Sequence, residues 1–341
     1  MTADQSGAMV TLDRPTIYDA IYQLAAGEGR EQLLFGSCAP MAHEAFQRSL
    51  VAGGFPLIWF ELPLLGAPRF DLHAALSPEA LRNSLQLPDD FDRAYAPVFA
   101  WYAHEEQGGN GLAFAYDISE GRIDAPALHV NVNDAPLVNI GRFFELAAGA
   151  DAPALYQRFV DCLPQGWRVW YTGVHPARPG SHLRVDCFVN RELKAAYASD
   201  LTLLEHDLRS CGFTAKLDAL EKLARPILSS PFGLELQFDI MRDGNVGPTL
   251  GISTEIPHCL PANAHAEVWM QSAHLMHVVE EMGLADERWK AIRAASYALS
   301  VAVNGTNLKL FCMPAFVKLR MRDGVPLDAK VYLQASASYA E

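Results

Sequence analysis

Alternating polar and apolar residues mark several short segments of this sequence. In residues 183–189, Arg184, Asp186 and Phe188 alternate with Leu, Val, Cys and Val. Successive side chains of a β-strand point to opposite faces, so such a segment gathers its polar residues on one face. An Arg there can hold a phosphate group through two parallel hydrogen bonds, and a Lys can hold it as a point charge. These faces therefore predict a site for a charged ligand.

The same alternation recurs in five predicted β-hairpins, each with Gly, Pro, Asp or Asn at its turn. They cover residues 57–74, 111–133, 167–190, 233–256 and 308–335. Segments with helical periodicity precede or separate them. These segments are 16–29, 41–52, 78–104, 137–162, 191–227 and 264–300. The chain order is thus helices followed by a hairpin, five times over.

Ten strands that each have a polar face cannot form a sandwich with a dry core. Two arrangements remain, an open antiparallel sheet covered by helices on one side, and a closed barrel with helices outside and a polar lumen. Closure removes edge strands, and about ten strands leave room for a ligand. We predict an α+β fold in which five αα-ββ repeats build a ten-stranded antiparallel β-barrel with a polar lumen, surrounded by helices. Residues 1–14 are expected to be a flexible N-terminus and residues 15–340 a single domain.

Composition and motifs exclude several function classes. The 341 residues have a formal net charge of -13, which disfavours nucleic acid as a partner. No stretch reaches the roughly 18 apolar residues of a membrane span, and no secretory signal opens the chain, so we expect no membrane association and a cytoplasmic location. Nucleotide-binding glycine motifs are absent, so no organic cofactor is predicted. Nothing in the sequence indicates an oligomeric state.

The second and third predicted hairpins resemble those of the cyanobactin peptide prenyltransferases. The stretches that carry the resemblance are 114–118, 127–136, 166–167 and 181–189. The resemblance implies the prenyltransferase barrel, also called the ABBA fold, and the transfer of an isoprenoid from its diphosphate to an acceptor.

The first hairpin, with Phe-Glu-Leu at 60–62 and Arg-Phe-Asp at 69–71, is similar to that of the fungal indole prenyltransferases. That similarity implies that Glu61 deprotonates or orients the acceptor and that Arg69 grips diphosphate. The chain also departs from these relatives. Ala127 stands where they usually have Lys, and Asp186 stands where the fungal enzymes have a second cation.

Prenyl transfer needs fixed cations for the leaving diphosphate, aromatic faces for the allylic cation and a weak base for the acceptor proton. We predict Glu61 as the catalytic residue. Four cations are predicted to bind the diphosphate, Arg69, Arg184, Lys318 and Lys330. The prenyl and acceptor pocket is predicted to be lined by Trp59, His129, Asp186, Phe188, Glu235, Asp239 and Tyr332. Each cation also has a plain interpretation, a strand Lys or Arg paired with a neighbouring carboxylate.

The cyanobactin resemblance further implies Mg²⁺, which Asp186 and Glu235 could help to position with the diphosphate. The several acidic residues expected in the lumen favour a basic acceptor, because a buried guanidinium requires paired carboxylates. The predicted function is therefore prenylation, from dimethylallyl or geranyl diphosphate, of a side chain of a ribosomally made, post-translationally modified peptide, with Arg or another basic residue as the hypothesised acceptor. One alternative is a prenyltransferase acting on a free aromatic small molecule. The other is a non-catalytic barrel that binds a peptide or a small hydrophobic ligand.

Overall fold

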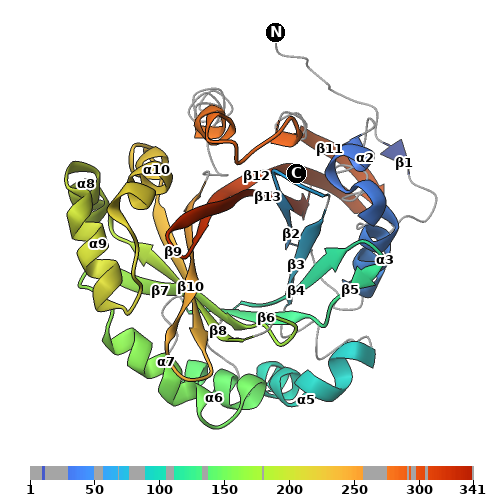
Figure 1. Cartoon of the computed structure of the whole chain (residues 1–341). Coiled ribbons are helices and arrows are strands. Elements are labelled where there is room, and N and C mark those ends of the chain that lie inside the picture. The colour runs from blue at the N-terminus through green and yellow to red at the C-terminus, as the bar shows by residue number, and fades with distance from the viewer. Residues whose placement is uncertain are drawn as a thin grey trace.

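The polar and apolar alternation is realised in ten antiparallel strands, seen along the barrel axis in Figure 1. The computed structural model describes residues 10–11, 30–49, 57–67, 69–76, 89–104, 111–132, 137–178, 180–255, 275–289, 292, 297–303 and 306–339. The barrel strands are β2 (Leu57–Pro63), β3 (Phe70–Leu76), β4 (Leu112–Ser119), β6 (Ala127–Asn131), β7 (Trp167–Val174), β8 (Ser181–Val189), β9 (Leu234–Met241), β10 (Val246–Glu255), β12 (Thr306–Arg322) and β13 (Val325–Tyr339).

Neighbouring strands pair in the order β12-β10-β9-β8-β7-β6-β4-β3-β2-β13, and β13 pairs back with β12, so the sheet closes. This confirms the predicted α+β barrel surrounded by helices. Each hairpin joins two ring neighbours that run in opposite directions, so all five hairpin turns lie at one end of the barrel. We call this the turn end, which includes turn residues 175–178 and 323–324. The opposite end, where the strands connect to helices, is the helix end.

The hydrophobic core lies between the outer face of the barrel and the helices. Leu183, Val185, Cys187 and Val189, the apolar residues of β8, are fully buried there. Burying such a side chain contributes about 1.5–3 kcal/mol. The amphipathic helix α10 (Leu217–Leu228) supplies part of the opposing apolar surface. Because the apolar residues of the strands must face the helices, the alternating polar residues face the lumen.

The surrounding helices follow the predicted helical segments with breaks. They are α2 (Arg30–Leu34), the 3₁₀ turn η1 (Gly36–Cys38), α3 (Ala39–Ser49), α5 (Asp89–His104), α6 (Leu137–Ala148), α7 (Ala152–Asp161), α8 (Arg191–Ser199), α9 (Leu201–Ser210) and α10. The predicted segment 191–227 breaks at Asp200, whose carboxylate caps α9 by accepting a hydrogen bond from the Thr202 backbone N–H at 3.0 Å. The predicted helix 16–29 lies outside the described residues.

The last predicted helical segment, 264–300, is wrong at its C-terminal end. Residues 275–281 are helical, but Tyr297–Val303 forms strand β11. In this heptapeptide large apolar residues alternate with Ala and Ser, and its Tyr and two Val residues favour a strand. It pairs with the first half of β12, so β12 and β13 extend beyond the predicted hairpin 308–335. Within the predicted flexible N-terminus only Val10–Thr11 are described, and they pair in parallel with β11 as β1.

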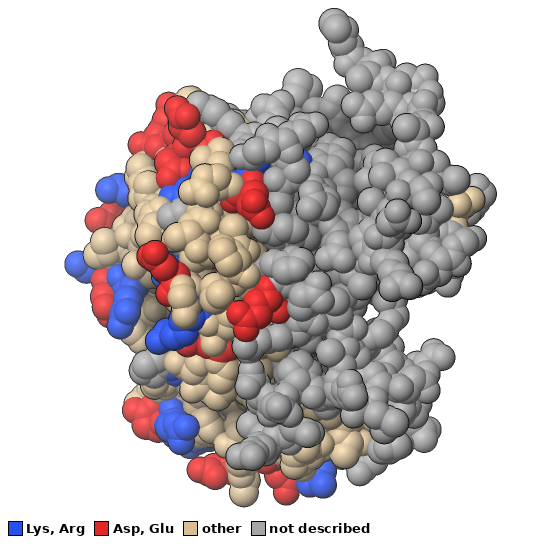
Figure 2. Space-filling view, turned by 90° about the vertical axis from the view of Figure 1, so that its right-hand side faces the viewer, with Lys and Arg blue, Asp and Glu red and all other residues tan. Residues whose placement is uncertain are grey.

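Two further findings concern the surface. None of the described helices combines the length and the apolar character required to cross a lipid bilayer. Figure 2 shows acidic and basic side chains interspersed over the described part of one face, without a continuous patch of either sign.

Candidate functional site

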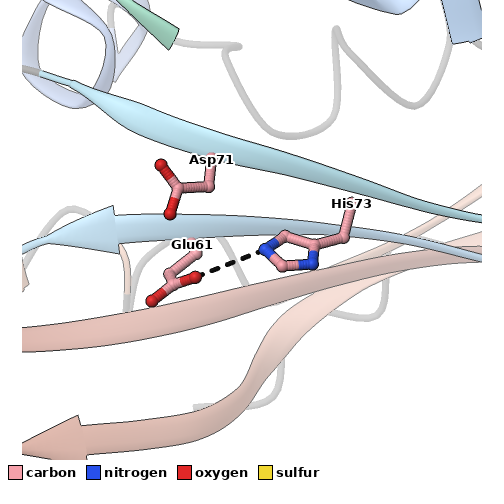
Figure 3. A group of neighbouring side chains, drawn as sticks. All are labelled: Glu61, Asp71 and His73. Atoms are coloured by element: carbon pink, nitrogen blue, oxygen red, sulfur yellow. Dashed lines mark hydrogen bonds and ion pairs between the residues drawn. The ribbon is translucent and has the colours of Figure 1, made fainter. Parts of the chain in front are cut away.

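The centre of the lumen contains a buried carboxylate surrounded by three nitrogen groups. Glu61 on β2 lies 3.0 Å from the Nζ of Lys330 on β13 and 3.6 Å from the Nζ of Lys318 on β12. Its other oxygen lies 3.3 Å from Nε2 of His73 on β3, as Figure 3 shows. Lys318 and Lys330 are cross-strand partners, so the closure of the barrel between β12 and β13 positions both ammonium groups. We call Glu61, Lys318 and Lys330 the central triad.

Two opposing effects act on Glu61. Burial raises the pKa of this carboxyl, but the ammonium groups of Lys318 and Lys330 outweigh burial and hold the pKa well below its usual range. Glu61 is therefore ionised at neutral pH and is a weak base while both Lys side chains contact it. The cationic partners of Glu61 among the described residues are the two Lys side chains, and His73 is its third nitrogen partner.

Aromatic rings surround this triad. The Nζ of Lys318 donates a hydrogen bond to the hydroxyl of Tyr332 and lies 4.7 Å from the centre of its ring. His73 lies 5.9 Å and Phe316 5.8 Å from the same ring, between ring centres. Trp59, on the same strand as Glu61, is held by a 3.0 Å hydrogen bond from its Nε1 to Gln334. The centre of the lumen thus combines fixed cations with π faces.

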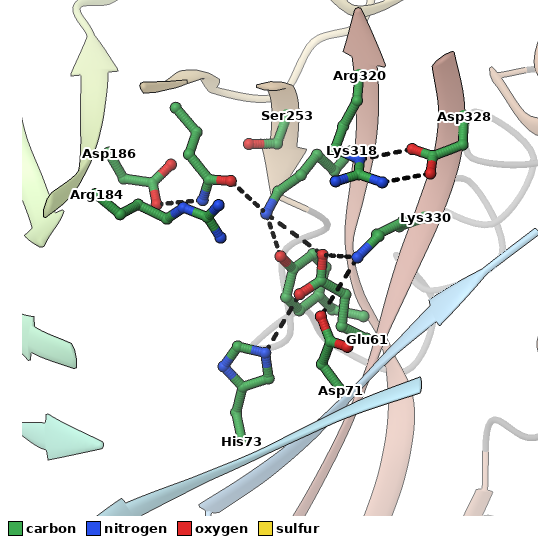
Figure 4. Close-up of polar contacts among 12 residues, drawn as sticks. Glu61, Asp71, His73, Arg184, Asp186, Ser253, Lys318, Arg320, Asp328 and Lys330 are labelled. Atoms are coloured by element: carbon green, nitrogen blue, oxygen red, sulfur yellow. Dashed lines mark hydrogen bonds and ion pairs between the residues drawn. The ribbon is translucent and has the colours of Figure 1, made fainter. Parts of the chain in front are cut away.

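At the turn end, carboxylates and guanidinium groups form ion pairs. Arg178 donates hydrogen bonds of 2.7 and 2.6 Å to Asp117 and one of 3.3 Å to Asp71. Arg184 donates to Asp239 at 2.9 Å, and Arg320 forms two hydrogen bonds with Asp328, as Figure 4 shows for the latter pair. Burial raises the pKa of Asp117, but the Arg178 hydrogen bonds outweigh it and lower the pKa.

Arg178 is a site residue that the sequence reasoning missed. It lies in the turn between β7 and β8, and the alternation of a strand makes no prediction for a turn residue. The turn folds so that the guanidinium reaches β3 and β4, past the short strand β6. His73, Asp71 and Gln237 were visible on polar strand faces, but nothing in their spacing singled them out.

At the helix end, the carboxylates have neutral partners. Asp186 accepts a 2.6 Å hydrogen bond from the amide of Gln237, and Glu235 lies 3.4 Å from the hydroxyl of Ser253. Burial, reinforced by the nearby charges of Asp186 and Glu255, raises the pKa of Glu235 to about 8. Burial also raises the pKa of Glu255. No ion pair joins these three carboxylates to a cation within the described part of the chain.

Phe188 lies opposite Glu235 in the β8–β9 register, with its ring 6.3 Å from that of Trp170. The guanidinium of Arg168 lies 5.2 Å and 5.3 Å from the centres of these two rings. A pocket of about 320 Å³ opens beside Phe188 at the helix end. Its lining includes Arg191, Lys194, Phe232 and Glu255.

The four predicted diphosphate residues do not all occupy equivalent places. Lys318 and Lys330 lie together at the triad, and Arg184 is buried and paired with Asp239. The side chain of Arg69 is 54% exposed at the turn end, where it lies 3.4 Å from Asp328. Lys318, Lys330 and Arg184 are therefore the predicted cations that face the interior.

The predicted magnesium ligands Asp186 and Glu235 fit that role poorly. A pKa of about 8 means that Glu235 is mostly protonated at neutral pH, whereas a magnesium ligand must be ionised. Three ligand atoms lie within reach of one another only at Glu61, Asp71 and His73 among the described residues. There the Lys330 ammonium contacts both carboxylates and occupies the position that a metal ion would need. The donor set thus favours ammonium and guanidinium groups over a metal ion, and magnesium dependence stays a prediction.

Solved prenyltransferase structures have the same fold. The apo form of prenyltransferase PriB is 14% identical over 95% of this chain and 96% of that chain, with a TM-score of 0.58. The 5-dimethylallyltryptophan synthase from Streptomyces coelicolor is 12% identical over 94% of this chain and 97% of that chain, with a TM-score of 0.57. Neither a protein-family model nor a curated protein sequence matches the chain. The similarity establishes the prenyltransferase-barrel fold.

Proposed function

We propose that the protein transfers an isoprenoid from its diphosphate to an acceptor held in the lumen. The observation that supports this most is the central triad, in which two buried ammonium groups and one ionised carboxylate lie against the rings of Tyr332 and His73. A prenyl transfer site needs cations, π faces and a polar group for the acceptor in one water-poor cavity. Two of the structures with the same fold are complexes with tryptophan and a dimethylallyl thiolodiphosphate, according to their descriptions.

Each step of prenyl transfer has a candidate group in the lumen. The bond between the allylic carbon and the diphosphate oxygen breaks, and its electron pair leaves with the diphosphate. Lys318, Lys330 and Arg184 would stabilise the departing charge. The rings of Tyr332, His73 and Phe188 would face the allylic cation. The acceptor supplies the electron pair of the new bond to that carbon and releases one proton, which in a guanidinium or ammonium acceptor must leave before the bond forms. Glu61 would orient the acceptor and take this proton once the diphosphate has drawn the Lys side chains away.

For the acceptor, we propose a basic side chain of a modified peptide. Asp186, Glu235 and Glu255 have no cationic partner within the described residues, and a guanidinium or ammonium group of the acceptor would supply one. Such a cation would also lower the pKa of Glu235 and ionise it. The pocket beside Phe188 would receive the residues next to the modified one.

A free aromatic small molecule is the second candidate acceptor. Two neighbours of the same fold are described as complexes with tryptophan, and the rings of Trp59, Phe188 and Tyr332 offer stacking surfaces here as well. A barrel that only binds a ligand would hold neither donor analogue through the triad. The acceptor panel and the titration described next distinguish these cases.

The test is calorimetric titration with dimethylallyl and geranyl thiolodiphosphate, each with and without Mg²⁺, on the wild type and on Lys318→Gln. We expect binding in the wild type and a tenfold to hundredfold weaker Kd, in rough terms, for the variant, because a charged hydrogen bond is lost. Mass spectrometry of a panel of Arg-, His-, Trp- and Tyr-containing peptides and free tryptophan then identifies the acceptor. Absence of binding to either analogue under all conditions would contradict the proposal.

A further inference from the structure

Two buried histidines near the triad have no hydrogen-bond partner. Both ring nitrogens of His129 on β6, and both of His175 at the start of the β7–β8 turn, lack a partner in the described part of the chain. Each residue is only 3% exposed. A buried polar group without a partner costs about 1–3 kcal/mol, so four such nitrogens in one place indicate that something binds there.

The fold holds the two rings in a defined arrangement. The rings meet edge to face with their centres 4.8 Å apart, and His129 stacks on Tyr171 at 5.1 Å. Gly173, the cross-strand partner of His129, makes room for this ring, because a Cβ at position 173 would lie 2.6 Å from Nδ1 of His129. On the other side of Gly173, Arg184 is its partner in β8. The row His129, Gly173 and Arg184 thus crosses three neighbouring strands.

The charges that act on both rings are positive. Burial lowers the pKa of His129 and of His175 well below the usual range, and the cations add to this effect. The groups that add to this lowering are His73 from β3, Arg178 from the β7–β8 turn, Arg184 from β8 and, for His129, Lys318 from β12. Of these, Arg178 is paired with Asp117 and Arg184 with Asp239. Both rings are therefore neutral at neutral pH, with one N–H donor each, in a positive environment that favours an anion and repels a cation.

We propose that His129 and His175 form an anion subsite beside Arg184, where their N–H groups donate to one phosphoryl group of the isoprenoid diphosphate. This inference rests on the proposed function and assigns to the diphosphate two residues that lie on the far side of Arg184 from Asp239. A bound phosphoryl group would provide partners for the rings. It would also favour their protonated forms, so the free protein should take up protons as the anion binds.

The experiment titrates inorganic pyrophosphate into the full chain at pH 7.0, in two buffers that differ in ionisation enthalpy. The dependence of the heat on the buffer gives the number of protons taken up. Wild type is compared with His129→Gln, His175→Gln, Lys318→Gln and the control His206→Gln, whose side chain is 81% exposed on α9. The ionisation of pyrophosphate itself is common to all variants, so differences from the wild type report the imidazoles.

We expect His129→Gln and His175→Gln each to weaken the Kd by roughly tenfold to a hundredfold and to reduce proton uptake. Lys318→Gln should weaken the Kd but keep the uptake, and His206→Gln should change neither. Nitrogen NMR of the wild-type imidazoles, which does not depend on variants folding, should show protonation of two rings when pyrophosphate is added.

Two outcomes would overturn the inference, and they separate it from the proposed function. If pyrophosphate binds the wild type, and the two histidine variants equal it in Kd and proton uptake, the subsite is wrong and the diphosphate function stands. If pyrophosphate and both thiolodiphosphates fail to bind the wild type, the donor site and the subsite both fail.

Discussion

At the turn end of the lumen Asp117 accepts two hydrogen bonds from the guanidinium of Arg178, whereas at the helix end Asp186 accepts one from the neutral amide of Gln237. The same contrast separates Asp239, paired with Arg184, from Glu235, whose hydrogen-bond donor among the described residues is the hydroxyl of Ser253. Both regions face one lumen and are built by the same alternation. The two ends differ in whether an Arg or Lys side chain of the protein pairs with each carboxylate.

This difference teaches which carboxylates of the lumen are neutralised by cations of the protein itself. Buried charges are stable when paired, and at the turn end Asp117, Asp239 and Asp328 each have a guanidinium partner. At the helix end, burial and the nearby charges of Asp186 and Glu255 raise the pKa of Glu235, which has no cationic partner among the described residues. The ion pairs of the turn end therefore act as a structural seal beside the proposed anion subsite, and the carboxylates of the helix end are suited to receive a cationic group from outside. Four changes test this interpretation.

The largest expected effect is loss of the seal by Arg178→Gln. Removing one partner of a mostly buried ion pair leaves Asp117 and Asp71 without their guanidinium, and we expect the free energy of unfolding to fall by about 2–4 kcal/mol. Urea denaturation at pH 7.5 measures it. Arg142→Gln, which removes an exposed pair with Glu145, is the control and should change stability by less than about 0.5 kcal/mol.

Adding Asp117→Asn to Arg178→Gln should restore roughly half of the lost stability, because the uncompensated charge disappears. Equal stability of Arg178→Gln and wild type would mean that the turn end is not a seal.

The second change is Glu235→Gln at the helix end, which should stabilise the protein. Its folded pKa of about 8 exceeds its unfolded value, so the folded state binds one more proton between those two values and stability falls as pH rises through that window. Between pH 5.5 and 7.5 the ionisation of Glu235 lowers the free energy of unfolding by roughly 2–3 kcal/mol. Gln does not ionise, so the variant should not lose this stability.

Urea denaturation of the wild type and of Glu235→Gln at both pH values measures this slope. Glu287→Gln, an exposed carboxylate, is the matched control and should follow the wild type. A variant that is less stable than the wild type at pH 7.5 would show that Glu235 already has a charged partner.

The sequence predicts the direction of each strand side chain but not its ion-pair partner. The barrel, its polar lumen and the inward position of Glu61, Lys318 and Lys330 follow from alternation, because burying the apolar face determines the direction of every second side chain. Which carboxylate pairs with which cation depends on the register of strands far apart in the chain, so the partners of Glu61 were not predictable. Arg178 required the conformation of a turn, and the low exposure of His175 required the same turn.

The third change, Glu255→Gln, tests whether a carboxylate without a cationic partner at the helix end recognises a basic acceptor. If a basic side chain is the acceptor, Glu255→Gln should raise its KM by about tenfold, since one charged hydrogen bond is lost. The KM of a neutral aromatic acceptor should stay within about twofold. Steady-state kinetics with both acceptors measures this, again with Glu287→Gln as the control. An equal rise for both acceptors would indicate that Glu255 supports the pocket rather than recognising charge.

The smallest expected effect belongs to Arg69, which the sequence places with the diphosphate cations. Its guanidinium is more than half exposed and lies 3.4 Å from Asp328, which Arg320 already neutralises with two hydrogen bonds. Arg69→Gln should therefore change the Kd for dimethylallyl thiolodiphosphate by less than about threefold and stability by less than about 0.5 kcal/mol. Arg184→Gln, measured in parallel, removes a buried guanidinium from the interior and should weaken binding by at least about tenfold. If Arg69→Gln weakened binding as much as Arg184→Gln, the diphosphate would extend beyond Arg184 to the rim of the turn end, and the ion pairs of that rim would bind ligand as well as seal the barrel.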